Sequence, residues 1–220
     1  VDPNRAGIDQ QGAIGADAGP RRLQVLGIGL YRALAERPPA ELDGAVSGVA
    51  LNPDDNWSLN IDQIRHALRP NTKLISINFP NNPTGTIIPR DRFDDLVELC
   101  RERGIYLFSD EVYRLLERDA GIRLPQAADV YERALSLNVM SKAYGLPGLR
   151  IGWVMTKDRE VLQRMERYKH YLSICNSAPS ERLAIIALKA RDKILTRNRA
   201  LVSENLRKLT AFFNDFPASF

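Results

Sequence analysis

The chain has 220 residues, of which 44% are hydrophobic and 26% are charged, a composition that is ordinary for a globular protein with a sizeable core. The formal net charge is +4, and the basic excess lies between Lys157 and Lys208, interleaved with acidic residues. We interpret this stretch as solvated helix faces, which argues against a nucleic-acid surface. The chain has no apolar run of membrane-spanning length and no signal-peptide pattern, so we expect a cytoplasmic protein that does not bind a membrane.

Two cysteines and two histidines restrict the metal and redox chemistry of the chain. Cys100 and Cys175 lie far apart with no partner motif, which indicates free thiols in a reducing cytoplasm. Cys100 falls on the apolar face of a predicted helix, where we expect it to pack. His66 and His170 are too few to indicate a zinc site, so we expect no bound metal.

Hydrophobic periodicity separates an atypical first segment from a regular remainder. Residues 1–45 are rich in Gly, Ala, Arg and Pro and show little periodicity, which predicts weak or irregular structure. Strands are predicted at 46–51, 73–79, 105–109, 134–139 and 151–155. Helices are predicted from the Asn60 cap to about Leu68, at 91–103 with Gly104 as the stop, at 158–173, and at 180–213 with a break near Asp192.

This alternation of strands and helices predicts an α/β fold with an open, mostly parallel sheet flanked by helices. The stretch 105–109 is apolar up to Ser109, as expected of a parallel strand that is covered on both faces. Ligands bind such sheets at the carboxyl ends of the strands. Three motifs fall at these ends or in the loops that follow them, so we expect the functional site there.

The first motif is Asn78-Phe79-Pro80-Asn81-Asn82-Pro83-Thr84-Gly85-Thr86, directly after a predicted strand. Its prolines and Gly85 are typical of a tight loop. In such a loop, Asn82 can present its carboxamide to a ligand as a hydrogen-bond donor. A plain turn in which Asn82 caps its own backbone accounts for this motif equally well.

The second motif is Ser109-Asp110-Glu111-Val112-Tyr113. Asp110 follows an apolar strand, so its carboxylate should be partly buried and should have a positive or hydrogen-bonding partner. Tyr113 can point its hydroxyl into the same cleft. The alternative role for Asp110 is a helix N-cap. We expect Glu111 to face solvent or to form a salt bridge rather than to act in catalysis.

The third motif, SKAYGLPGLRIGW, runs from Ser141 to Trp153 after the predicted strand 134–139. A lysine at a strand end, as Lys142 is here, can form an imine with a carbonyl cofactor. Arg150 follows across a turn shaped by glycine and proline, and its guanidinium can bind a phosphate with two hydrogen bonds. The alternative is that both are ordinary surface residues, which the shaped turn and the order of the three motifs argue against.

Together, the three motifs resemble the pyridoxal-phosphate (PLP) aminotransferases of fold type I, class I and II, over roughly residues 46–220. The resemblance implies the PLP-binding large domain over 46–175, followed at 176–220 by a long helical region that leads into a small domain. It also implies an enzyme that moves an amino group between an amino acid and a 2-oxo acid. The intact enzyme is expected to be a homodimer.

The resemblance implies a role for each residue of the site. Lys142 forms the Schiff base with the cofactor aldehyde and then moves the proton at the substrate carbon. Asp110 pairs with the protonated ring nitrogen. Tyr113 and Asn82 bond the phenolic oxygen of the ring, and Asn82 can also meet the substrate carboxylate. Arg150 binds the phosphate.

The chain departs from the family pattern in three places. Val139 stands where many relatives carry a hydroxyl residue that holds the phosphate, and Ser141 is expected to compensate. Relatives carry an earlier phosphate-binding loop, an aromatic residue that stacks on the ring and segments that reach across a dimer, and residues 1–45 match none of these. Tyr31 lies at about the right distance before Val46 to be that aromatic residue, but its surroundings do not fit the pattern. The small domain with its substrate-binding arginine is missing. We therefore interpret the chain as a fragment that is expected to be inactive alone.

Three other interpretations stay open. A PLP-dependent lyase or cyclising synthase of the same fold would use identical cofactor residues and differ only in its product. A transcription regulator with an aminotransferase-like domain would need a preceding helix-turn-helix, which residues 1–45 do not indicate. A poorly folded remnant would expose a sheet edge and aggregate.

Overall fold

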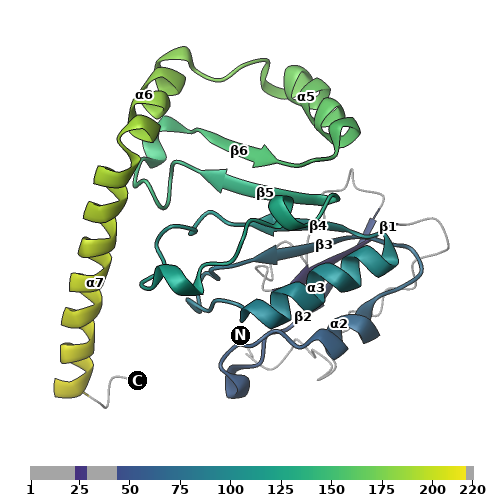
Figure 1. Cartoon of the computed structure of the whole chain (residues 1–220), viewed down its shortest axis with the longest axis horizontal. Coiled ribbons are helices and arrows are strands. Elements are labelled where there is room, and N and C mark those ends of the chain that lie inside the picture. The colour runs from purple at the N-terminus through teal and green to yellow at the C-terminus, as the bar shows by residue number, and fades with distance from the viewer. Residues whose placement is uncertain (1–22, 29–43, 217–220) are drawn as a thin grey trace, which may run out of the picture. The chain divides into compact units, whose positions relative to one another are not determined.

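The computed structural model describes residues 23–28 and 44–216, whose helices and strands are labelled in Figure 1. The chain forms two compact units. The first unit contains the described residues up to Glu111, together with Leu124–Leu137 and Val154–Gln163. The second unit contains Val112–Arg123, Asn138–Trp153 and the described residues from Arg164 onward.

The strands form a sheet with the order β2-β1-β3-β4-β5-β6. They are β1 (Leu23–Ile28), β2 (Gly44–Val49), β3 (Thr72–Asn78), β4 (Tyr106–Asp110), β5 (Ala134–Val139) and β6 (Gly152–Met155). The pairs β1/β2, β1/β3, β3/β4 and β4/β5 are parallel, whereas the arrow of β6 runs opposite to that of β5 (Figure 1). The predicted α/β fold with a mostly parallel sheet is therefore confirmed.

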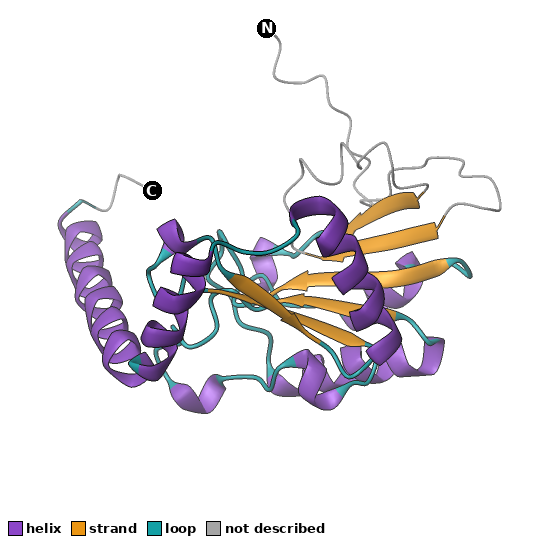
Figure 2. Ribbon diagram, turned by 90° about the horizontal axis from the view of Figure 1, so that it is seen from above, coloured by secondary structure: helices purple, strands orange, loops and turns teal. Residues whose placement is uncertain are grey.

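The helices of the first unit begin and end where local chemistry predicts. α2 (Ile61–Ala67) starts at Asn60, whose Oδ1 accepts hydrogen bonds from the N–H groups of Asp62 and Gln63. α3 (Arg90–Arg103) stops at Gly104, which has a φ of 62° that glycine adopts without steric cost. Both helices lie on one side of the strands (Figure 1), and Figure 2 shows this helical layer beside the sheet. The buried residues of the two helices join those of β3 and β4 in one apolar core.

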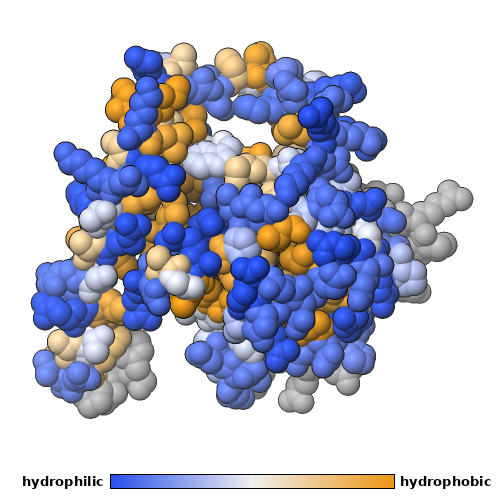
Figure 3. Space-filling view, viewed as in Figure 1, coloured by the Kyte–Doolittle hydropathy of each residue, from blue (hydrophilic) through white to orange (hydrophobic). Residues whose placement is uncertain are grey.

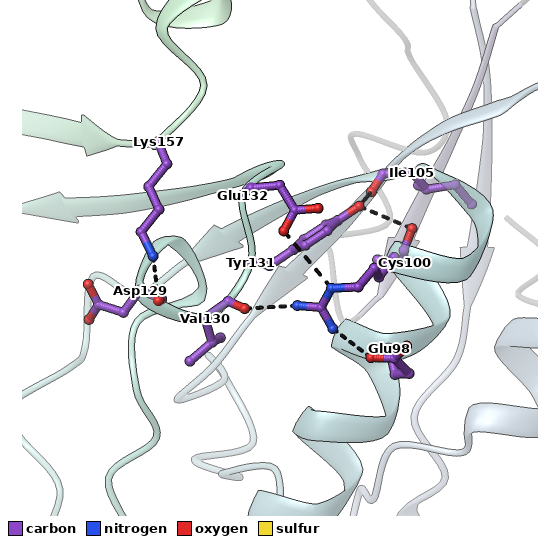
Figure 4. A network of polar contacts seen from close by, with 9 residues as sticks. Glu98, Cys100, Ile105, Asp129, Val130, Tyr131, Glu132 and Lys157 are labelled. Atoms are coloured by element: carbon purple, nitrogen blue, oxygen red, sulfur yellow. Dashed lines mark hydrogen bonds and ion pairs between the residues drawn. The ribbon is translucent and has the colours of Figure 1, made fainter.

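A polar network closes the carboxyl end of α3 (Figure 4). The hydroxyl of the buried Tyr131, just after α4 (Ala127–Val130), lies 2.8 Å from Ile105 O and 3.1 Å from Cys100 O. Burial raises the pKa of this phenol to about 12, so it remains a donor at neutral pH. Burial also raises the pKa of the Cys100 thiol to about 12, and the predicted packing role of Cys100 is confirmed.

The second unit has a smaller apolar core that contains Met140, Ala143, Tyr144, Ala184, Ala187 and Leu195. α6 (Ala178–Lys189) and α7 (Arg191–Asp215) meet at Ala190, which confirms the predicted break near Asp192. Before them, α5 (Arg159–Ser173) runs from the first unit into the second. Figure 3 shows apolar side chains gathered over α6. Within the described residues, no helix combines the length and the apolarity needed to cross a membrane.

One expectation about the strands needs correction. Irregular structure over 1–45 is wrong for Leu23–Ile28, because this stretch forms β1 between β2 and β3. Tyr31 and the rest of 29–43 lie outside the described residues. The two faces of β4 are both covered, but to different degrees: Leu107 and Ser109 are buried, whereas Tyr106 and Phe108 are half-buried. Leu107 shares its core cluster with the buried residues of α3, which contacts β4.

Candidate functional site

Asn78, the last residue of β3, connects two of the predicted site residues in the first unit. Its Nδ2 donates to the backbone oxygen of Asp110 at 3.3 Å, and its Oδ1 accepts from the N–H of Asn82 at 3.1 Å. The side chain of Asn78 is buried. Sequence reasoning treated Asn78 only as the start of the first motif, whereas the structure assigns it the role of holding Asn82 and Asp110 together.

The loop that carries Asn82 is held by its own side chains. Asn81 Oδ1 accepts a hydrogen bond from Thr84 Oγ at 2.8 Å, and the Asn81 N–H donates to Thr86 O at 2.8 Å. Gly85 has a φ of 74°, which glycine adopts most readily, and its N–H donates to Asn81 O at 2.8 Å. This confirms the predicted tight loop, in which Asn82 is half-buried.

Asp110 and Glu111 follow the second predicted strand, and their environments differ. Asp110 ends β4 and is half-buried, as predicted, opposite Asn78 in the strand register. Of the two environments expected for Glu111, solvent or a salt bridge, exposure to solvent is wrong, because this residue is buried. Glu111 Oε1 accepts hydrogen bonds from Ala127 N at 2.9 Å and Ser136 Oγ at 2.8 Å. Glu111 therefore links β4 to the start of α4 and to β5.

In the second unit, the structure brings Lys142 and Tyr113 together. Lys142 Nζ lies 5.4 Å from the centroid of the Tyr113 ring, within the range of a cation–π contact. Lys142 is exposed, whereas Ser141 and Tyr113 are half-buried. An exposed primary amine beside a phenol ring is accessible to a carbonyl compound, as the imine formation predicted for Lys142 requires.

Arg150 lies at the end of the same loop, after the short 3₁₀ helix η3 (Pro147–Leu149). Its φ is 54°, and its Nη1 donates to Pro147 O at 3.0 Å, so the guanidinium folds back toward its own turn. The side chain is exposed. A guanidinium carries five N–H donors, so this bond is compatible with the predicted binding of a phosphate.

The loop between β5 and β6 closes on itself. Met140 N donates to Ile151 O at 3.0 Å, and Leu146 N donates to Met140 O at 3.0 Å. At Gly152, a Cβ atom would lie 2.8 Å from Val139 Cγ1, so this position accepts only glycine without a shift. Val139 therefore packs against the start of β6.

In the first unit, Asn78 thus links the backbones of Asp110 and Asn82, and the second unit pairs an amine with a phenol ring within cation–π range, next to a turn that carries Arg150. Carboxylate, amide, amine, phenol and guanidinium are the kinds of polar group that a PLP site requires, and the exposed Lys142 amine fits the cofactor's aldehyde. The family model for "Aminotransferase class I and II" matches residues 41–217, so the chain belongs to this family.

Individual relatives agree with this assignment. Capreomycidine synthase of Streptomyces vinaceus is 31% identical over 72% of this chain and 40% of its own length. An aspartate aminotransferase of Thermococcus kodakarensis is 28% identical over 74% of this chain and 42% of its own length. Among solved structures, a PLP-dependent aminotransferase from Streptococcus suis has a TM-score of 0.81 and 32% identity, covering 89% of this chain and 51% of that one. The chain therefore spans about half the length of the relatives it matches.

Proposed function

We propose that the chain carries cofactor-binding residues of a PLP-dependent aminotransferase, which moves an amino group from an amino acid to a 2-oxo acid. The observation that carries this proposal is the exposed Lys142 amine, 5.4 Å from the Tyr113 ring, in a loop closed by backbone hydrogen bonds. Membership in the class I and II family supports it. When bound, the cofactor supplies an electron sink for the substrate carbon.

Each residue then has a defined task. Lys142 would hold the cofactor through its aldehyde, and its amine would hold and move the proton at the substrate carbon. The Asp110 carboxylate would hold a proton on the ring nitrogen by pairing with that cation. Tyr113 and Asn82 donate hydrogen bonds to the phenolic oxygen. Arg150 and Ser141 bind the phosphate, the first through a charge-assisted contact.

The proposal extends to the setting of the intact protein. We infer a cytoplasmic homodimer that acts on small amino and oxo acids and binds no nucleic acid. Sedimentation of the full-length protein tests the dimer. The division of the chain into a PLP-binding portion at 46–175 and a helical region at 176–220 belongs to the same proposal.

The decisive experiment is covalent trapping. The chain is incubated with PLP, reduced with borohydride and digested, and the modified peptide is identified by mass spectrometry. We expect the adduct on Lys142, and Lys142→Arg should abolish it. Lys157→Arg is the matched control and should leave the adduct unchanged, since Lys157 Nζ already donates to Asp129 O at 2.7 Å. An adduct on another lysine, or none, would remove the basis of the proposal.

The similarity to capreomycidine synthase favours a second candidate, a cyclising synthase with the same cofactor residues. Product analysis separates the two functions. The full-length protein is supplied with a panel of amino acids and 2-oxo acids, and transfer of the amino group to the oxo acid marks the aminotransferase. A cyclic product without a new amino acid marks the synthase.

A further inference from the structure

Lys142 and Tyr113 lie on two segments of the second unit, 138–153 and 112–123, and neither residue is in a regular helix or strand. A contact of 5.4 Å between the amine and the ring therefore needs support from elsewhere in the unit. Groups that act on one ligand must be held within a fraction of an ångström of their working positions. The residues that hold these two segments in place therefore contribute to the function of the site.

Helix α7 contacts both segments through two consecutive residues. Asn198 Nδ2 donates to the backbone oxygen of Ala143 at 2.9 Å, directly after Lys142. Arg199 Nη1 donates to the backbone oxygen of Leu115 at 3.3 Å, two residues after Tyr113. Both side chains are half-buried, whereas most of α7 around them is exposed.

The Leu115 backbone shows that its segment is under constraint. Leu115 has a φ of 79°, a left-handed conformation that is rare for a residue with a branched side chain. Its N–H donates to the buried Glu117 Oε2 at 2.9 Å, and the same oxygen accepts from Arg123 Nε at 2.9 Å. The peptide groups on both sides of Leu115 are therefore held, one by Glu117 and the other by Arg199. Such strained residues persist only where their surroundings determine them, and they cluster at functional sites.

The Lys142 loop shows a matching constraint. Gly145 has a φ of 66°, and a Cβ atom there would lie 3.4 Å from Asn198 Nδ2. Its N–H donates to Lys142 O at 2.9 Å, which closes the turn around the lysine. α7 itself is anchored to this loop by the buried Leu195, which shares a core cluster with Ala143. The helix and the loop therefore form one packed body.

We propose that Asn198 and Arg199 are positioning residues that set the distance between the Lys142 amine and the Tyr113 ring. This inference rests on the proposed function, because it assigns α7 the task of preorganising the groups that meet the cofactor. Neither side chain touches the reacting atoms. Each acts through a backbone oxygen of the segment that carries a site residue.

Three variants of the 220-residue chain test the proposal: Asn198→Ala, Arg199→Ala and the control Arg197→Ala. Arg197 is exposed on the same helix, and its replacement by alanine removes the same charge as Arg199→Ala does. The first readout is amide hydrogen exchange without cofactor. We expect Asn198→Ala to accelerate exchange at Gly145 and Leu146 by about tenfold, the effect of losing roughly one hydrogen bond. Arg199→Ala should do the same around Leu115.

The second readout is the equilibrium constant for covalent attachment of PLP, which is measured by absorbance at a series of pH values. We expect both test variants to weaken attachment by about tenfold, again the equivalent of roughly one hydrogen bond. A fourth variant, Arg199→Lys, should restore part of the loss because it keeps a cationic donor. Amides of β3 in the first unit serve as the internal check that the variants remain folded.

The outcomes separate this inference from the proposed function. If the unsubstituted chain does not trap PLP on Lys142, the proposed function fails, whatever the exchange data show. If it traps PLP but Asn198→Ala and Arg199→Ala match Arg197→Ala in both readouts, the positioning role is overturned. Local acceleration together with weaker attachment supports it. Local acceleration with unchanged attachment also overturns it, because the contacts would then be structural only.

Discussion

Substitution of Asn78 tests how the first unit sets the positions of Asn82 and Asp110. Asn78 is 8% exposed and makes one hydrogen bond to each of these two backbones, at 3.1 and 3.3 Å. A neutral hydrogen bond contributes about 0.5–1.5 kcal/mol, and the bond at 3.3 Å is longer than the usual range. Because both bonds are lost in Asn78→Ala, we expect the free energy of unfolding to fall by about 2 kcal/mol.

Equilibrium urea unfolding measures this change. The chain has two tryptophans, and Trp57 lies in the first unit whereas Trp153 lies in the second. A Trp153→Phe background therefore makes the fluorescence of Trp57 a reporter for the unit that contains Asn78. Gln63→Ala, at an exposed position of α2, is the control and should change stability by less than about 0.5 kcal/mol.

Asn78→Leu separates hydrogen bonding from packing, since leucine fills a similar volume without polar atoms. If the two hydrogen bonds dominate, Asn78→Leu should lose about as much stability as Asn78→Ala. Recovery of the original stability in Asn78→Leu would refute the reasoning. Both variants should also weaken PLP attachment, because the Asn82 and Asp110 backbones are then less well held.

Three further predictions concern stability. Tyr131→Phe removes a buried hydroxyl that contacts two backbone oxygens and should lower the free energy of unfolding by about 1–2 kcal/mol in urea; no change would refute it. Gly152→Ala should cost about 1–3 kcal/mol, measured by Trp153 fluorescence, because its Cβ would overlap Val139; a neutral effect contradicts this packing. The pKa of Asp158 is lowered by N–H groups at the start of α5 and by the Tyr106 hydroxyl. Its stabilisation is complete above its ordinary pKa of 3.8 and is lost as the pH falls through the lowered value, so the stability difference from Asp158→Asn should stay constant at higher pH and close only as the pH falls below 3.8. A stability difference between the two proteins that does not change with pH would rule out this role of Asp158.

The elements that sequence reasoning predicted well depend on neighbours in the chain. The Asn60 cap involves residues two and three positions away, and the Gly104 stop involves carbonyls of the preceding turn. The sequence also predicted the tight Asn82 loop, whose hydrogen bonds join residues two to five positions apart.

The errors arise where distant residues decide the environment. Glu111 was expected to face solvent or to form a salt bridge, but it is buried and accepts hydrogen bonds from residues 16 and 25 positions away. Leu23–Ile28 is a short, mostly apolar run, and hydrophobic periodicity alone does not identify such a run as a strand. It forms a strand because it pairs with β2 and β3.

By itself, the sequence determined the family motifs, because Asn82, Asp110, Tyr113, Lys142 and Arg150 are specified by short runs of residues whose turns and strands form locally. Only the tertiary structure decided which side chains support them. Asn78 contacts Asp110 from 32 positions away, and Asn198 and Arg199 act across 55 and 84 positions. A hydrogen bond over such a separation leaves no periodic pattern in the sequence, since it exists only where folding brings a side chain to a distant backbone.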